Sequence, residues 1–221
     1  IDTQKASTKG VSTRTVIQTL STAMGGHRIT DVREGSALEP TWIVIEAPLA
    51  NVSSADEVRR FPMPDPSAEG RYDHAKADIA RFKDDYFIVG DLELTIFEMA
   101  WHMVGMEKAM IAMTVGEPYF DVLLDRVVEF SIGVGVRLVE LGVDAIWCGD
   151  DFGSQNGMLI SPAMWRDMFK PRFAELFAEL KAANPDVLIC YHSDGAVAPI
   201  LDGMVEIPAG RRATGGLDRP G

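Results

Sequence analysis

Acidic and histidine side chains stand directly after three apolar runs of this 221-residue sequence. Asp91 ends the run YFIVGD, Asp150 and Asp151 follow VDAIWCG, and His192 and Asp194 come at the end of VLICYHSD. Carboxylates can stabilise a developing positive charge, and an imidazole can transfer a proton near neutral pH. The same side chains are also ligands for divalent metal ions. These residue types in these places predict a reaction or binding site.

The apolar runs themselves predict β-strands, and helical patterns separate them. Strands are expected at 41–47, 86–91, 143–149 and 187–192. Helices are expected at 14–24, 72–82, 94–115 with a break at Gly105, 118–141, 162–183 with a kink at Pro171, and 197–207. This alternation indicates parallel βα units, in an open doubly wound sheet or a closed (β/α)8 barrel. In both folds ligands bind at the carboxyl ends of the strands.

Strand geometry predicts how the acidic residues are oriented. Because side chains alternate along a strand, we expect Asp91, Asp150, His192 and Asp194 to share one inner face and Asp151 to turn to the other side. Asp150 and His192 are the expected catalytic residues. Each residue alone also has a structural interpretation, since an aspartate at a strand end commonly caps the next helix.

The loop GDDFGSQNG, after the third predicted strand, supplies a further candidate. Its glycines permit close backbone approach or positive φ. Gln155 lies in this loop, and we expect it to contact substrate together with Asp91, Asp151 and Asp194.

Composition limits the classes of partner. The formal charge of −12 argues against nucleic acid and anionic membranes as partners. No apolar run approaches the ~20 residues of a membrane span. The two cysteines, Cys148 and Cys190, lie in apolar runs and are expected to be free thiols of a cytoplasmic protein.

Four segments resemble the uroporphyrinogen decarboxylase family. They are FPMPDP, GDLELTIFEMAWHMVGMEK, GDDFGSQNGMLISPAMWRDMFKPR and VLICYHSDGAVAPIL. The resemblance runs from about Trp42 to Val205 and implies a (β/α)8 barrel, incomplete in this chain, with its site at the carboxyl ends of the strands. We therefore expect a partial barrel domain at 42–207, a poorly patterned segment at 1–41 and a disordered tail at 208–221.

The resemblance implies an enzyme and offers two chemistries. Decarboxylases of the family remove carboxyl groups from a tetrapyrrole without a cofactor, and a carboxylate there can stabilise the cation formed when a pyrrole is protonated. This lyase-type reaction, on a small or tetrapyrrole-like ligand and with no cofactor, is our leading expectation. The arginine-rich RQAGRY-like loop that holds the decarboxylase substrate has no counterpart in this sequence.

The second chemistry is corrinoid-dependent methyl transfer or demethylation. Relatives of that branch hold zinc with a His-x-Cys pair and a later cysteine, and they act with a corrinoid protein. The pair reads His192-Ser193-Asp194 here, so an aspartate stands in the place of the cysteine. Zinc, if used, would have His192, Asp194 and Cys148 as its candidate ligands. A third hypothesis is an incomplete, non-catalytic barrel with open strand edges, for which a homodimer is expected.

Overall fold

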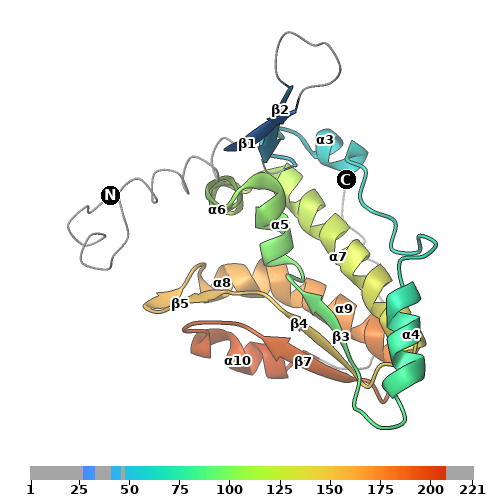
Figure 1. Ribbon diagram of the computed structural model, residues 1–221. Coiled ribbons are helices and arrows are strands. Elements are labelled where there is room, and N and C mark those ends of the chain that lie inside the picture. Colours follow the sequence, from blue (N-terminus) through green and yellow to red (C-terminus); the bar gives the residue numbers. More distant parts are fainter. Residues whose placement is uncertain (1–26, 33–40, 46–47, 208–221) are drawn as a thin grey trace, which may run out of the picture. The chain divides into compact units, whose positions relative to one another are not determined.

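The computed structural model describes residues 27–32, 41–45 and 48–207 (Figure 1). They belong to two compact units, one with residues up to Val58 and 100–120, the other with residues 59–99 and those from 121 onward. The expected helix at 14–24 and the expected disordered tail at 208–221 lie outside the described residues, as does most of segment 1–41.

A three-stranded parallel sheet lies in the second unit. It consists of β3 (Val89–Glu93), β4 (Ala145–Gly149) and β7 (Leu188–His192), in the spatial order β3-β4-β7. β4 pairs in parallel with both neighbours, which confirms an α/β fold with a parallel sheet. The second predicted strand is displaced: Tyr86 and Phe87 precede β3 and are exposed.

Two long helices cover one face of this sheet. They are α7 (Pro118–Glu140) and α9 (Lys170–Ala183). A Cβ atom at Gly135 of α7 would lie 2.7 Å from a Leu180 methyl carbon of α9 and 2.8 Å from one of Leu92 of β3. The Phe173 ring of α9 packs edge-on against Tyr191 of β7 with 5.3 Å between centroids. The buried core of this unit therefore lies between the helices and the sheet.

Arg172 connects the two covering helices. Its side chain is buried, and its Nε and one terminal nitrogen donate to Asp125 Oδ1 of α7 at 2.9 and 2.6 Å. The same terminal nitrogen also donates to Asp121 at 3.3 Å. Two charged N–H donors that share one carboxylate oxygen fix the relative position of the helices better than a single bond would.

The opposite face of the sheet is open among the described residues. Val89, Trp147 and Leu188 point to this face and are 48%, 39% and 53% exposed, whereas Ile146 and Cys148 point to the helices and are buried. In a closed (β/α)8 barrel, the face away from the helices is the interior.

The expected helix at 162–183 is interrupted, as its proline predicts. It begins at α8 (Pro162–Met164), widens into a π-helical turn at η1 (Trp165–Phe169) and continues as α9. Ser161 caps the start by accepting a bond from the Met164 N–H at 3.1 Å. Pro171 has no N–H to donate, and the π turn lies directly before it.

The first unit contains the strand that sequence patterning placed at 41–47. This strand, β2 (Thr41–Ile45), pairs antiparallel with β1 (His27–Val32). It is a strand, but the expectation that it belongs to a parallel βα unit is wrong. The same unit contains α6 (Met106–Val115), which starts after Gly105.

The remaining helices agree closely with the sequence patterns. They are α4 (Asp73–Phe82), α5 (Phe97–Val104), which ends before Gly105 as expected, and α10 (Ala198–Val205). A further short helix, α3 (Ala55–Arg60), lies where the sequence patterns predicted none. No helix among the described residues is both long and apolar enough to cross a membrane. The described parallel sheet has three strands and is not a closed barrel.

Candidate functional site

The three parallel strands end at the same level, which brings three loops together. Glu93, Gly149 and His192 are paired in one row across β3, β4 and β7. The buried Thr95 fastens the first loop to β4: its Oγ1 accepts from Gly149 N–H at 2.8 Å, and its own N–H donates to the Gly149 carbonyl at 3.1 Å.

The loops after β4 and β7 lie against each other without space for side chains. The first forms a small hairpin, β5 (Gly153–Ser154) with β6 (Gly157–Met158). A Cβ atom at Gly153 would lie 2.6 Å from the Ala196 nitrogen, and one at Gly195, where φ is +79°, would lie 2.5 Å from the Gly153 carbonyl carbon. Only glycine fits these two positions without a backbone shift.

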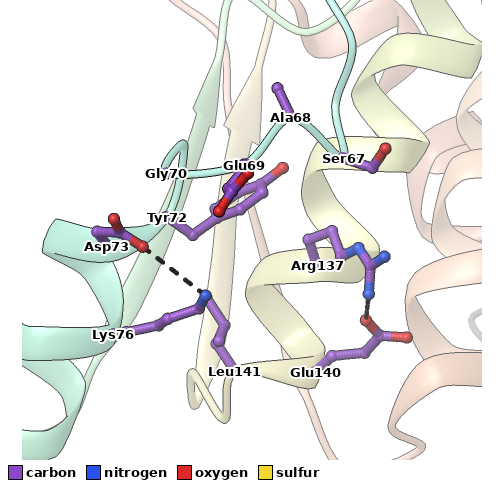
Figure 2. Close-up of a pocket in the computed structure, with 10 residues that line it drawn as sticks. All are labelled: Ser67, Ala68, Glu69, Gly70, Tyr72, Asp73, Lys76, Arg137, Glu140 and Leu141. Carbon is purple, nitrogen blue, oxygen red and sulfur yellow. Dashed lines mark hydrogen bonds and ion pairs between the residues drawn. The ribbon is translucent and has the colours of Figure 1, made fainter.

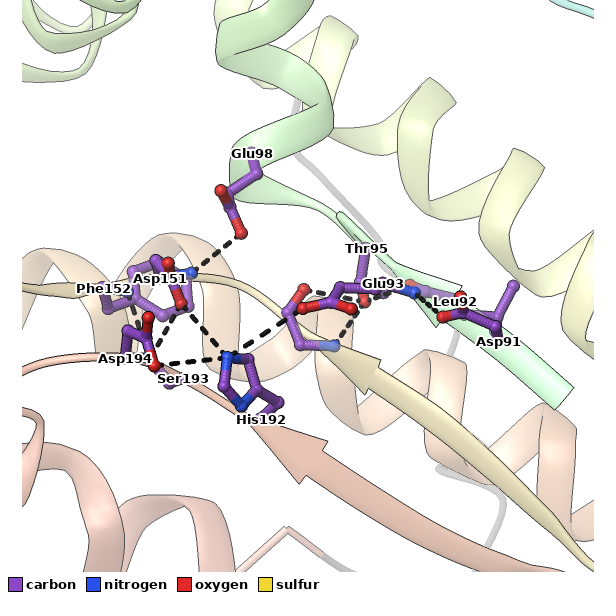
Figure 3. Close-up of polar contacts among 11 residues, drawn as sticks. Asp91, Leu92, Glu93, Thr95, Glu98, Asp151, Phe152, His192, Ser193 and Asp194 are labelled. Atoms are coloured by element: carbon purple, nitrogen blue, oxygen red, sulfur yellow. Dashed lines mark hydrogen bonds and ion pairs between the residues drawn. The ribbon is translucent and has the colours of Figure 1, made fainter. Parts of the chain in front are cut away.

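His192 lies among carboxylates at this edge (Figure 3). Its Nε2 is 3.5 Å from Asp194 Oδ1, 3.8 Å from Asp151 Oδ1 and 3.9 Å from Glu93 Oε1. The imidazole is one-third exposed, so a ligand can reach it. An accessible imidazole with carboxylates on several sides can exchange a proton with a ligand while the carboxylates stabilise positive charge.

Backbone amides hold these carboxylates in place. Asp194 N–H donates to Asp151 Oδ1 at 2.7 Å, and Asp151 N–H donates to Glu98 Oε2 at 3.1 Å. Partial burial raises the pKa of Glu98, and the nearby Asp151 and Glu93 carboxylates raise it further, against the lowering effect of the Asp151 amide. Among residues 48–207, no lysine or arginine forms an ion pair with Glu93, Glu98, Asp151 or Asp194. We call these four carboxylates and His192 the acidic cluster.

Three members of the acidic cluster have the chemistry of a metal site. One ligand atom each from Asp151, His192 and Asp194 lie within 4.8 Å of one another. One imidazole nitrogen and two carboxylate oxygens form a donor set that zinc and similar divalent ions accept. The donor set therefore fits a metal, with Asp151 as the third ligand where sequence reasoning named Cys148.

Cys148 lies on the other side of the sheet. Its side chain is buried on the helix-covered face, and its Sγ is 3.6 Å from the Cys190 carbonyl oxygen. Burial, with the Asp150 carboxylate nearby, raises the pKa of the Cys148 thiol. A buried neutral thiol on this face does not join the metal candidates His192 and Asp194, so the expectation that Cys148 lies with them is wrong.

Asp150 is also directed away from His192. Its carboxylate is fully buried and accepts the N–H groups of Ile96, at 2.9 and 3.1 Å, and Glu98, at 2.9 Å, at the amino end of α5. Burial raises the pKa of Asp150 to about 7, outweighing these amide bonds, which lower it. The expectation that Asp150 shares the face of His192 is wrong: Asp150 caps a helix, and Asp151 faces the imidazole.

The other two predicted residues lie at the margin of the acidic cluster. Asp91 is exposed on the open face of β3, where its Oδ1 accepts the Glu93 N–H at 2.9 Å. Gln155 is exposed at the tip of the β5–β6 hairpin. Asp91 therefore lies two residues before Glu93 on the same face of β3, whereas Gln155 lies on the loop that follows β4.

Sequence reasoning missed three residues that the structure adds. Glu93 is two positions beyond Asp91, so alternation along the strand could have found it. Glu98 follows in the first turn of α5. Trp147 of β4 stacks on His192 with 5.7 Å between ring centroids and 25° between ring planes. Because Trp147 lies within the apolar run VDAIWCG, sequence alone indicated a core residue.

A polar hollow of about 440 Å³ lies elsewhere in the second unit (Figure 2). Four of its charged side chains form two pairs, Lys76 with Asp73 at 3.9 Å and Arg137 with Glu140 at 2.8 Å. The Tyr72 hydroxyl donates to the Pro66 carbonyl at 2.6 Å. None of the predicted site residues lines this hollow.

Comparisons with known proteins concern the fold and the family of this chain. A methyltransferase from Methanosarcina mazei has a similar fold, with a TM-score of 0.54 and 23% sequence identity. The match covers 85% of this chain and 52% of that protein, so the chain spans about half the length of the solved structure it resembles. No curated protein matches the sequence. The family model for uroporphyrinogen decarboxylase matches residues 44–215, which is more than half of the chain. The chain therefore belongs to the uroporphyrinogen decarboxylase family.

Proposed function

We propose that this protein is a lyase-type, decarboxylase-like enzyme whose reaction takes place at the acidic cluster. The observation that carries the proposal is the position of His192, whose Nε2 lies 3.5–3.9 Å from three carboxylates at the carboxyl edge of the parallel sheet. The family assignment supports decarboxylation, since its members include the enzyme that decarboxylates uroporphyrinogen.

The acidic cluster suits the cationic stage of such a reaction. Protonation of a pyrrole ring carbon gives a ring cation, and cleavage of the C–C bond to the carboxylate releases CO2 and returns the bonding electron pair to the ring. A proton shift then leaves a methyl group, so one proton is consumed for each CO2 released. His192 would move the proton, and Glu93, Asp151 and Asp194 would stabilise the cation.

The experiment is an assay of CO2 release from a single-ring pyrrole acetic acid and from uroporphyrinogen. We expect wild type to release CO2, and His192→Ala to do so about 10²- to 10⁴-fold more slowly, the usual range for removal of a proton-transfer group. Equal rates in the two proteins, or no release by wild type from either compound, would contradict the proposal.

A second candidate function is corrinoid-dependent methyl transfer with a corrinoid protein as partner. The observation that favours it is the grouping of Asp151, His192 and Asp194, which could hold zinc. A bound zinc ion would supply a Lewis acid that activates a thiol. Metal content after dialysis tests this: about one zinc per chain, lost in His192→Ala, supports methyl transfer, and no metal in either protein removes it.

The third hypothesis, a non-catalytic incomplete barrel, remains an alternative proposal. It is supported by the open face of the three-stranded sheet among the described residues. It predicts self-association and no turnover.

A further inference from the structure

Trp147 presents a half-exposed indole on the open face of the sheet. It is 39% exposed, and its register partners are Asp91 of β3 and Cys190 of β7. The next row toward the carboxyl edge holds Glu93 and His192, and the indole stacks on the His192 imidazole. An aromatic face therefore adjoins the acidic cluster.

Apart from His192, the ionisable side chains nearest this indole by register are acidic. Asp91 and Glu93 are its nearest carboxylates by register and lie on the same face of β3. No lysine or arginine of residues 48–207 lies over the Trp147 ring, although Phe82, Phe130 and Tyr119 each have such a partner. A tryptophan face attracts a cation through its ring quadrupole, most strongly when a carboxylate lies nearby. Among these residues, the ring face away from His192 therefore has no lysine or arginine partner.

We propose that Trp147 determines specificity at this site by binding an organic cation on its ring, with Asp91 and Glu93 as the counter-charges. The ligand class is a cationic nitrogen group with apolar surface, such as an alkylammonium or a cationic heteroaromatic ring. A small inorganic cation would gain from the carboxylates but would not use the apolar ring face. The inference rests on the proposed function only in placing the ligand beside His192.

Choline and its carbon isostere, 3,3-dimethylbutanol, form a matched pair of probes. They have the same shape and differ in one charge. N-methylpyridinium is the planar probe. Ligand-observed NMR on the full chain should show saturable binding of at least one cation with a Kd below about 10 mM, and no saturable binding of the isostere. Choline binding alone would identify an ammonium site, and N-methylpyridinium binding alone a planar-ring site; both support the inference.

Variants separate the indole from its surroundings. Trp147→Leu should weaken cation binding about fivefold, the size of one cation–π contact, while Trp147→Phe should weaken it less. Circular dichroism checks that each variant is folded. If Trp147→Leu does not fold, the comparison of Trp147→Phe and Asp91→Asn with wild type decides, and both should bind the cation more weakly.

Three outcomes would overturn the inference: no binding of either cation, saturable binding of the isostere as tight as that of choline, or unchanged cation binding when Trp147 is replaced. Each is independent of the turnover assay on His192→Ala. Cation binding can therefore fail while decarboxylation stands, and decarboxylation can fail while cation binding stands.

Discussion

Asp150 and Asp151 are adjacent in the sequence and have opposite environments. Asp150 is fully buried and bonded to the amino end of α5, whereas Asp151 is partly exposed and faces His192. A carboxylate at a helix amino end interacts favourably with the peptide dipoles, but complete burial disfavours its charge. One residue of the pair therefore holds the loop in place, and the next is available for chemistry.

The buried Asp150 makes stability depend on pH. Its pKa in the fold is raised to about 7 from an ordinary value of 3.8. The fold thus favours the protonated form, so this contribution to stability is complete below about pH 4 and declines as pH rises to 7. The expected slope is at most about 1.4 kcal/mol per pH unit. Urea unfolding of wild type and Asp150→Asn between pH 4.5 and 7 should show a steeper decline in wild type. Parallel curves would show that Asp150 does not titrate in this range.

The alternation of side chains along each strand could be predicted from sequence, but which of the two sets faces the helices could not. Cys148 and Asp150 do share a side, as expected. However, Cys148 is in register with Tyr191, and Cys190 with Trp147, so the two cysteines lie on opposite faces. Register between strands depends on long-range packing, and both faces of the run VDAIWCG are apolar enough to be buried. The error over Asp150 follows from this.

At the scale of elements, the loops after β4 and β7 form one layer. The Ala196 N–H donates to the Ser154 carbonyl at 2.9 Å, and the Phe152 N–H donates to Ser193 Oγ at 3.2 Å. Asp151 and Asp194 project from this layer, so their position depends on the close approach of two glycines. One of these glycines, Gly153, belongs to the run GDDFGSQNG, and the other, Gly195, belongs to the run SDG after β7.

Gly153→Ala tests the loop layer. Its Cβ would lie 2.6 Å from backbone atoms of Asp194 and Ala196, so the loops must separate. We expect a loss of about 1–3 kcal/mol in unfolding free energy, as for other overpacked sites. Gly116→Ala is the control, because it has a positive φ of +74° and no neighbour within 4 Å, and therefore measures backbone strain alone. A smaller loss for Gly153→Ala than for Gly116→Ala would contradict the contact.

Arg172 provides a test of how the helices are joined. Replacing it with alanine removes the bonds to Asp121 and Asp125 and leaves a cavity between α7 and α9. Thermal unfolding should show a loss of about 2–4 kcal/mol. Arg166→Ala, at an exposed position in the same region, should change stability by less than about 0.5 kcal/mol. Similar losses in the two variants would mean that the Arg172 contacts contribute little.

Helices were the most predictable elements because their signals are local. The break at Gly105, the Ser161 cap and the interruption near Pro171 all occur where the sequence places them. The antiparallel pairing of β2 with β1 was not predictable, because an apolar run of five residues indicates neither the strand it pairs with nor whether the pairing is parallel. Tertiary packing, rather than local preference, decides those features.

At the scale of the whole molecule, the parallel sheet has two open edges and one open face among the described residues. β3 and β7 each pair on one side only, and Val89 and Leu188 are about half exposed. Unpaired strand edges favour association with another chain. The order of the βα units and the family were predictable from motifs, whereas the extent of barrel closure was not, because closure depends on strands far apart in sequence.

Self-association is the expected consequence of these edges. Sedimentation velocity at rising protein concentration should show a dimer or larger species. Leu188→Lys, which places a charge on edge strand β7, should shift the equilibrium toward monomer. A wild-type chain that stays monomeric and unfolds cooperatively at about 100 μM would contradict this expectation.

The central claim is that chemistry takes place on the His192 side of the β4 loop, while Asp150 serves the fold. The most direct measurement is CO2 release from a pyrrole acetic acid by wild type, His192→Ala and Asp150→Asn, with the thermal stability of each. We predict that His192→Ala keeps its stability and loses turnover, and that Asp150→Asn changes in stability but keeps its turnover within a few-fold while folded. The reverse pattern, with turnover lost in folded Asp150→Asn and kept in His192→Ala, would contradict the account.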